Sequence, residues 1–334
     1  DWGQDECVLW EVVVIAGQEG PYVPGTYTAG YVNDDWNPGP RGLAIDANGD
    51  LWLGSYGTKT YHKIAGETGA ILSTVDVSST GHTPYGAVID SNGIVWSSGS
   101  GTNAVLRLDP STEAFHTVAL GHHSYGLGLD TAGHLFITGW DQTKLSRIDI
   151  NTGLKEWTIN GVHQSRGVAV TPDGDVWTAN SGPGTVTRWS PDGAIKSHID
   201  VGTTPTGVAV DADGKVWAVN YGDGFVKRID PVTNSVDLAK DLPGTQHYGY
   251  SDMTGMVVRN ATTRFGTWTV VHDSKTAGTN WDDIAWSAFE PGGLGLAMRV
   301  RSSEDAINWS SWTTVLSGDS LAGLPAGRYL QVHA

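Results

Sequence analysis

The segment Pro205-Thr206-Gly207-Val208-Ala209-Val210-Asp211-Ala212-Asp213-Gly214-Lys215-Val216-Trp217 decides the fold, because related segments recur along the chain. A close copy reads Ser165-Arg166-Gly167-Val168-Ala169-Val170-Thr171-Pro172-Asp173-Gly174-Asp175-Val176-Trp177. Each copy opens with an inner-strand glycine, and these are Gly42, Gly86, Gly126, Gly167, Gly207 and Gly249, at steps of 44, 40, 41, 40 and 42 residues. Such a period, built from short apolar runs and Gly-containing turns, is typical of the blade of a β-propeller.

Within each copy, the order of residue types indicates a hairpin-rich blade. Turns such as Asp211-Ala212-Asp213-Gly214 suit hairpins, because Gly supplies a positive φ and Asp binds the turn's own backbone. They lack the terminal bidentate Glu of a calcium-binding EF-hand loop. The second strand carries an aromatic residue that we expect between blades: Trp52, Trp96, Phe136, Trp177 and Trp217. The third strand carries a basic residue that we expect to brace neighbouring blades: Lys63, Arg107, Arg147, Arg188 and Arg228.

The number of copies favours six blades, with five or seven as alternatives. Five copies are clear, and the sixth, over 248–259, is degenerate. The apolar segment 9–15 resembles an outer strand, so we predict that it completes the last blade. After residue 260 the period ends, and alternating strand-like segments separated by turns predict a small antiparallel β-sandwich. We therefore expect an all-β chain with a propeller over 1–260 and an accessory sandwich over 261–334.

Composition limits the partners. The net charge is −16, with only 20 Lys and Arg among 334 residues, which argues against nucleic acid because phosphate binding needs a basic surface. The single cysteine, Cys7, excludes an intrachain disulfide. No apolar run is long enough for a transmembrane segment. The abundance of Gly, Ser, Thr and Trp with few lysines favours a secreted, extracellular or cell-surface protein.

The candidate binding site lies where the blades meet at one mouth of the central channel. The residue before each inner-strand glycine, here called the pre-glycine residue, is expected there: Arg41, Tyr85, Tyr125, Arg166, Thr206 and Tyr248. A second ring follows the blade aromatic and includes Asn180 and Asn220, with Trp140 beside it. Five of the 11 histidines lie close to these positions: His82, His122, His123, His163 and His247. Since Tyr and Arg contribute strongly to binding energy, this mouth predicts a site for a glycan, a small molecule or a protein.

The core pattern Gly-Val-Ala-Val-Asp followed by Gly-x-Val-Trp resembles that of the streptogramin B lyase family and, more loosely, of NHL-repeat propellers, over about residues 40 to 260. In that family a Pro-His pair supplies catalytic histidines, a Glu follows the blade aromatic, and Mg²⁺ helps to hold a lactone substrate. Here the matching pre-glycine residues include no histidine, and the positions after the aromatic hold neither Glu nor Asp. The resemblance therefore implies the fold and leaves the activity without its expected residues.

The displaced histidines offer an alternative route to chemistry. Imidazole transfers protons near neutral pH and binds divalent metals, so His122, His123 and His163 are catalytic candidates. A divalent metal such as Mg²⁺ or Ca²⁺ has candidate ligands in His122, His163, Asp34 and Asp35. The alternative interpretation is that these are solvated loop residues with no shared ligand and no cofactor.

The C-terminal segment resembles jelly-roll-like sandwich modules appended to bacterial extracellular proteins. The resemblance is carried by the runs 299–312 and 327–332. Such modules often bind carbohydrate or act as spacers. Trp309 and Trp312 are accordingly expected either to stack on sugars or to pack beneath a loop.

Three functions are compatible with these patterns. The leading interpretation is a binding protein that uses the channel mouth and does not catalyse a reaction. The second is a lyase or hydrolase of the streptogramin B lyase type, acting on a lactone or saccharide through histidines near the mouth. The third is a structural subunit of an extracellular homo-oligomer or filament, linked by exchanged strands or by sandwich edges.

Overall fold

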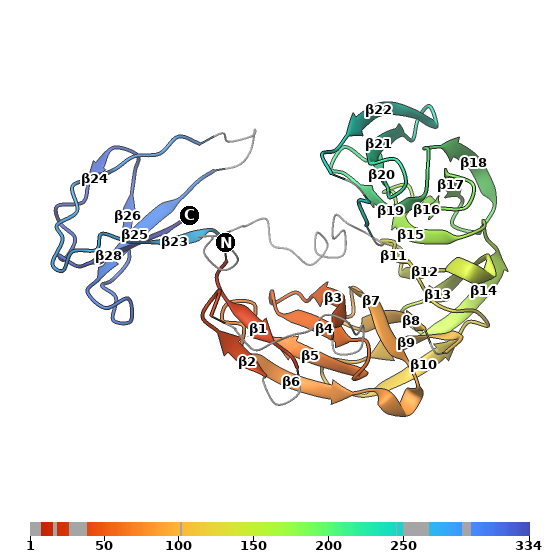
Figure 1. Cartoon of the computed structure of the whole chain (residues 1–334), viewed down its shortest axis with the longest axis horizontal. Helices are drawn as coiled ribbons and strands as arrows, with labels where there is room; N and C mark the ends of the chain where they lie inside the picture. The colour runs from red at the N-terminus through yellow and green to blue at the C-terminus, as the bar shows by residue number, and fades with distance from the viewer. Residues whose placement is uncertain are drawn as a thin grey trace. The chain divides into compact units, whose positions relative to one another are not determined.

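The computed structural model describes residues 8–15, 19–26, 39–100, 102–244, 246–249, 267–288 and 295–334. The chain divides into two compact units, Leu9–Thr262 and Thr263–Ala334. The described residues form strands and loops with two short 3-10 helices, η1 (Ser78–Thr80) and η2 (Trp140–Gln142) (Figure 1). In this part of the chain no helix has the length and hydrophobicity to cross a bilayer. The prediction of an all-β chain is confirmed.

Five four-stranded antiparallel sheets follow one another along the first unit, and each strand pairs with the next in sequence (Figure 1). The first two sheets contain β3 (Pro40–Ile45), β4 (Leu51–Ser55), β5 (Thr60–Ile64), β6 (Ile71–Asp76), β7 (Thr83–Ile89), β8 (Val95–Ser100), β9 (Ala104–Leu108) and β10 (Phe115–Ala119). The other three contain β11 (Leu127–Leu129), β12 (His134–Gly139), β13 (Lys144–Asp149), β14 (Leu154–Asn160), β15 (Ser165–Val170), β16 (Val176–Asn180), β17 (Thr185–Trp189), β18 (Ile195–Asp200), β19 (Pro205–Val210), β20 (Val216–Asn220), β21 (Phe225–Asp230) and β22 (Ser235–Asp241). These sheets are the predicted blades.

The sixth copy takes its place beside the fifth. The backbone N–H of Gly249 donates to Thr206 Oγ1 at 3.2 Å, and a Cβ atom on Gly207 would lie 2.8 Å from the carbonyl carbon of Gly249. Each inner strand thus packs on the next, and six such positions are consistent with the expected six-bladed propeller. The rest of the sixth copy, 250–259, lies outside the described residues.

The N-terminal segment forms a hairpin against the first blade. Strand β1 (Glu11–Val13) pairs with β2 (Gly20–Tyr22), and Trp10 Nε1 donates to the carbonyl oxygen of Gly66 at 2.8 Å. This contact places the hairpin at the turn between β5 and β6. The predicted pairing of the N-terminal strand with the last blade involves residues outside the described ranges and stays a prediction.

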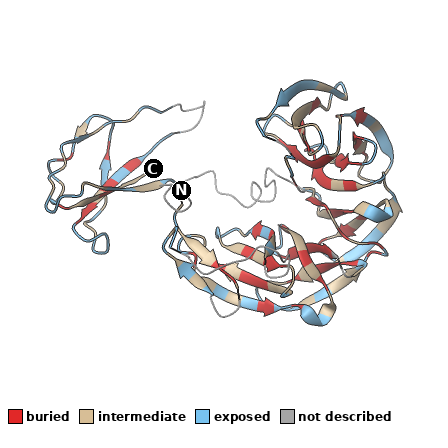
Figure 2. Cartoon of the chain, in the orientation of Figure 1, coloured by how far each residue is buried: buried red, intermediate tan, exposed pale blue. Residues whose placement is uncertain are grey.

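The hydrophobic core lies between blades. Trp52, Trp96, Phe136 and Trp177 are at most 1% exposed, and each belongs to a cluster that joins residues of two adjacent blades. Figure 2 shows the buried residues along these packed strands. Trp217, the fifth of these aromatics, is half-buried. Four of the five aromatic residues therefore have the interblade position that the sequence predicts.

The Asp-rich turns bind their own backbone. Asp90 Oδ1 accepts from the N–H groups of Asn92 and Ile94, and its other oxygen accepts from Trp96 Nε1 at 2.7 Å. Asp211 makes the same contacts, including one with Trp217 Nε1 at 2.7 Å. This pattern confirms hairpin turns and shows that the carboxylates also orient the indole of the second strand.

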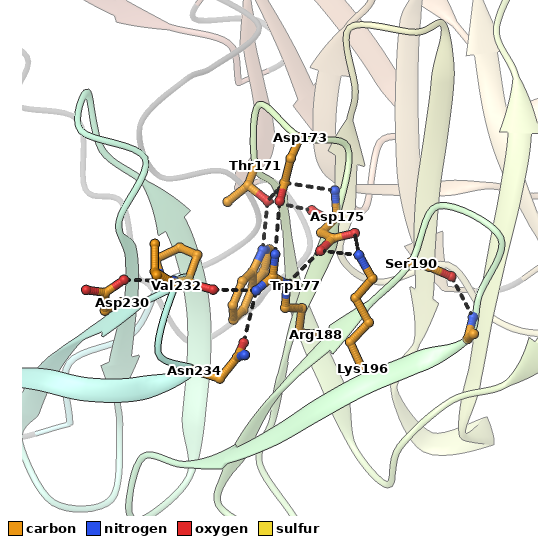
Figure 3. Close-up of polar contacts among 12 residues, drawn as sticks. Thr171, Asp173, Asp175, Trp177, Arg188, Ser190, Lys196, Asp230, Val232 and Asn234 are labelled. Carbon is orange, nitrogen blue, oxygen red and sulfur yellow. Dashed lines mark hydrogen bonds and ion pairs between the residues drawn. The ribbon is translucent and has the colours of Figure 1, made fainter.

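The basic residue of the third strand links adjacent blades. Arg188 Nε contacts Asp175 Oδ2 at 2.6 Å and Nη2 contacts Asp173 Oδ2 at 2.9 Å, both within its own blade (Figure 3). Its Nη1 donates to the carbonyl oxygen of Pro231 and to Asn234 Oδ1 in the next blade. Arg147 repeats the link through Pro191 at 2.8 Å. The predicted brace between blades is confirmed at both positions.

The inner-strand glycines allow blades to touch through their backbones. A Cβ atom on Gly126 would collide with the carbonyl oxygen of Arg166, and one on Gly167 would lie 2.9 Å from Gly207 Cα. Real Cβ atoms do not approach backbone this closely. Glycine is therefore required by the packing distance at these two positions and not by an unusual φ.

The second unit contains two antiparallel sheets. Its four-stranded sheet has the order β23 (Thr269–Asp273), β28 (Tyr329–His333), β25 (Met298–Ser303) and β26 (Thr313–Val315), and β24 (Asp283–Ile284) pairs with β27 (Asp319–Ser320). Val300 and Leu330 of the larger sheet share one core with Leu321 and Ile284. The guanidinium carbon of Arg301 lies 4.4 Å from the ring centroid of Trp312 and 5.0 Å from that of Trp309. Both tryptophans thus pack on an arginine, and the likeness to jelly-roll-like modules stays a prediction.

Candidate functional site

Four of the six pre-glycine residues lie at irregularities of the inner strands. In the second blade Pro84 pairs with Gly99 and Gly86 with Ser98, so Tyr85 has no partner residue on β8. The register shifts in the same way at Arg41, Arg166 and Thr206. A β-bulge of this kind turns the extra side chain away from the regular alternation of the strand. The repeat therefore positions these side chains through backbone geometry.

Four of the six pre-glycine residues meet around one cavity. The cavity has a volume of about 380 Å³, and its walls are formed by Tyr56, Tyr85, Gly99, His123, Ser124, Tyr125, Trp140, Asp141, Arg166 and Tyr248. These residues come from four described blades and from the start of the sixth copy. The volume lies within the range of small-molecule sites.

Aromatic rings form most of the cavity wall. The ring centroids of Tyr85 and Tyr125 are 5.3 Å apart, and those of Tyr125 and Trp140 are 5.7 Å apart. Tyr56 stands edge-on to Tyr85 at 6.3 Å. The Tyr125 hydroxyl bonds to the Tyr248 hydroxyl and lies 3.4 Å from the Tyr85 hydroxyl. Burial, together with hydrogen bonds to Tyr248 and Tyr85, raises the pKa of Tyr125, so this phenol remains a proton donor at neutral pH.

Arg166 is the cation of the cavity. Its guanidinium carbon lies 4.9 Å from the ring centroid of Trp140, 5.9 Å from that of Tyr125 and 5.5 Å from that of Tyr248. Its Nη1 donates to the Tyr248 hydroxyl at 2.6 Å and to the Tyr125 hydroxyl at 3.4 Å. Its Nε is buried and has no hydrogen-bond partner among the described residues. Arg41 lies at the edge of this aromatic group, with its guanidinium carbon 5.2 Å from the Tyr85 ring centroid.

Three predicted binding residues belong to the packing of the blades and do not line the cavity. Thr206 is fully buried and bonds to Val219 and Gly249. Asn180 is also fully buried, and its Nδ2 donates to Thr187 Oγ1 at 2.8 Å. Asn220 is buried in the same way, with Nδ2 donating to the carbonyl oxygen of Val201 at 2.6 Å. The shorter side chains at the pre-glycine positions and at the positions after the blade aromatic thus bind other residues of the blades and do not line the cavity.

Two candidate histidines are buried structural groups. His82 Nε2 lies 3.0 Å from Ser97 Oγ, and burial lowers the pKa of His82 to about 4. His122 Nδ1 lies 2.7 Å from the carbonyl oxygen of His123, and its Nε2 lies 2.6 Å from Ser146 Oγ. These distances fit a tautomer that donates from Nδ1 and accepts at Nε2, and burial lowers the pKa of His122. Burial thus favours the neutral form of both rings.

The other three histidines have different surroundings. His123 lines the cavity, and its Nδ1 lies 3.5 Å from Asp141 Oδ2. His163 is exposed, and its ring packs against Gly182. His247 is half-buried beside Gly244. Of the five histidines predicted near the mouth, His123 alone is among the residues that line the described cavity.

The candidate metal ligands are not brought together in the described part of the chain. Within that part, no group of three or more His, Cys, Asp or Glu side chains is arranged to hold a metal ion. Both ring nitrogens of His122 are engaged by protein atoms. Asp34 and Asp35 lie outside the described residues.

The structure adds Tyr56 and Asp141 to the site. Tyr56 follows Ser55 as Trp140 follows Gly139, so the two rings occupy the same place in their blades. This equivalence was visible in the repeat and identifies Tyr56. Asp141 lies within helix η2, which interrupts the link between β12 and β13 and has no counterpart in the other described blades.

Comparisons with known proteins give the fold. No protein-family profile and no curated protein match the chain. A streptogramin B lyase structure is 17% identical with a TM-score of 0.58, over 65% of this chain and 74% of that chain. A virginiamycin B lyase from Staphylococcus aureus is 16% identical with a TM-score of 0.58, over 66% and 75% of the two chains. The structure of U3-55K is 13% identical with a TM-score of 0.54, over 64% and 70%. The class of protein is therefore a β-propeller, similar in fold to the streptogramin B lyases.

Proposed function

We propose that this chain is a binding protein whose propeller takes up a small ring-containing molecule, such as an aromatic compound or a sugar, at the channel mouth. The observation that carries the proposal is the cavity of about 380 Å³ whose wall includes five tyrosine and tryptophan rings. Such rings provide a large contact area with little conformational freedom to lose on binding. The acidic, Trp-rich composition supports an extracellular setting for this role.

Trp140 gives the direct test. Its ring lies within stacking distance of both Tyr125 and Arg166, so a ligand in the cavity should change its fluorescence. We expect 4-nitrophenyl glycosides to bind in calorimetric titrations, and Trp140→Ala to weaken binding about tenfold or more, which corresponds to about 1.4 kcal/mol.

The matched control is Trp268→Ala, which removes the same kind of side chain from an exposed position (53%) of the second unit. This control should bind as the unchanged protein does. If Trp140→Ala and the unchanged protein bind the glycosides equally, or if no ring compound binds at millimolar concentration, the proposed function is wrong.

A second candidate function rests on the pair formed by His123 and Asp141. A carboxylate 3.5 Å from a ring nitrogen orients an imidazole for proton transfer, and both residues line the cavity. This pair makes a lyase or hydrolase the alternative. Such an enzyme should open a lactone or cleave a glycoside with turnover that His123→Ala abolishes, while Trp268→Ala leaves that turnover unchanged.

A further inference from the structure

The arginines of the propeller differ in their carboxylate partners. Arg147 and Arg188 at blade junctions, and Arg228 within its own blade, each contact an acidic side chain, at 2.5 Å, 2.6 Å and 2.9 Å. Arg107 has no ion pair among the described residues, but it stacks on Trp96 at a junction. Arg166 has no carboxylate within 4.0 Å among the described residues, although the chain carries 36 Asp and Glu. It is the cation that lines the cavity.

The surroundings of Arg166 supply rings and hydroxyl groups in place of a counterion. Cation–π contacts with Trp140, Tyr125 and Tyr248 partly compensate the guanidinium for lost hydration. Nη1 of Arg166 donates both of the side chain's hydrogen bonds to described residues, and Nη2 donates to no described residue. The guanidinium is therefore held in place with donor capacity left over.

Asp141 is the one acidic side chain among the described residues that line the cavity, and it is directed elsewhere. Asp141 Oδ2 lies 3.5 Å from His123 Nδ1 and is 51% exposed. The cavity wall thus combines a fixed guanidinium with phenol groups, which also donate hydrogen bonds. A carboxylate complements this set, because it accepts several hydrogen bonds and pairs with the planar guanidinium fork.

We propose that the natural occupant of the cavity is a ring compound that carries a carboxylate, with the carboxylate bound by Arg166 and the ring packed on Trp140 and Tyr125. This inference rests on the proposed function and names its ligand class. The cavity volume suits a single aryl or sugar ring with its substituents. Two sources have this chemistry, aromatic acids and uronic acids.

Matched acid and neutral probes test the charge. Calorimetric titrations at pH 7 would compare 4-hydroxybenzoate with 4-hydroxybenzamide, and galacturonate with galactose. We expect at least one acid to bind about tenfold or more tightly than its neutral counterpart, since a charge-assisted pair in a partly desolvated site exceeds a neutral hydrogen bond. A preference for 4-hydroxybenzoate identifies the ligand as an aromatic acid, and a preference for galacturonate identifies it as a uronic acid.

Three variants locate the preference. Arg166→Gln should remove the preference for the acid and retain binding of the neutral probe. Arg166→Lys keeps the positive charge but lacks the planar guanidinium fork, so it should retain only part of the preference for the acid. Lys155→Gln removes one positive charge from an exposed position of the same unit, outside the cavity, and should leave the preference unchanged.

The outcomes separate this inference from the proposed function. If acid and neutral probes bind equally, or if Arg166→Gln keeps the preference, the inference is wrong while the binding function stands. If neither kind of probe binds, both are wrong. If Asp141→Asn alone raises the affinity for the acids about tenfold, Asp141 is the counterion of Arg166 in solution, and the cavity is not built for an acid.

Discussion

Arg188 and Arg166 lie in the same blade and have opposite surroundings. Arg188 reaches Asp173, Asp175 and the next blade, and its guanidinium carbon stacks on Trp177 at 5.0 Å (Figure 3). Arg166 stacks on three rings and contacts hydroxyl groups only, among the described residues. The first arginine completes its contacts within the propeller, so we expect it to serve stability. The second has no carboxylate partner among the described residues, which is why we proposed that it binds an acidic ligand.

This difference separates structural from functional arginines without reference to a relative. Both residues stack on aromatic rings, so stacking alone is not informative. The presence of buried carboxylate and carbonyl partners is informative, because a buried charge that lacks them must be compensated otherwise. Substitutions at the blade junction should therefore change unfolding, and substitutions at the mouth should change binding.

The largest effect is expected at Asp175. Its side chain is 2% exposed and contacts both Arg188 and Lys196 at 2.6 Å. Asp175→Ala leaves Arg188 partly unpaired in a buried place and should lower the free energy of unfolding by about 4 kcal/mol. Urea unfolding measures this. Asp192→Ala, which removes a 91% exposed carboxylate 3.6 Å from Arg147, should cost less than about 0.5 kcal/mol. If Asp175→Ala and Asp192→Ala lower the free energy of unfolding equally, burial of the carboxylate does not determine how much it stabilises the propeller.

His82 tests whether a histidine predicted at the mouth belongs to the structural group. Burial lowers its pKa from 6.5 to about 4 in the folded protein. Between these values the unfolded chain binds a proton that the folded chain does not, so stability falls as pH decreases from 6.5 to 4, by about 3 kcal/mol. His82→Gln should lose less stability over this interval in urea titrations. Parallel pH curves for the two proteins would contradict the assignment.

A small effect on stability, comparable to that of Asp192→Ala, is expected at Arg166. Arg166→Gln leaves no buried carboxylate without a partner, because none contacts this side chain among the described residues. The free energy of unfolding should change by about 0.5 kcal/mol or less. Thermal unfolding of the unliganded variant and of the unchanged protein measures this change in free energy. A loss comparable to that of Asp175→Ala would show that Arg166 is as structural as Arg188.

The repeat predicted the fold and the gathering of pre-glycine residues around one cavity because both depend on residues with a fixed period. The glycines, the turn aspartates and the blade aromatics each satisfy a local requirement that every copy shares. Tyr85, Tyr125 and Arg166 come from three blades with the same strand order, and Tyr248 comes from the start of the sixth copy; all four line the cavity.

The composition of the cavity wall was harder to predict because side-chain size decides which residues reach it. Thr206 and Asn180 have periodic positions equivalent to Arg166 and to the site next to Trp140, but they are short and find partners in the wall. His82 and His122 fill the space over Gly99 and Gly139, where a Cβ atom on either glycine would meet the imidazole ring. Such packing depends on pairs of residues in neighbouring loops, and a single repeat pattern does not contain that information.

The close approach of the inner strands has a consequence for how this protein evolves. Contact between backbones at Gly126 and Gly167 fixes how far apart consecutive blades stand. The neighbouring pre-glycine residue, which lies at a β-bulge in four copies, does not set this distance. It is Arg, Tyr or Thr in different copies, while the strand order of the described blades stays the same. Mutation at this position can therefore alter the lining of the cavity one blade at a time, while the spacing between the blades is unchanged.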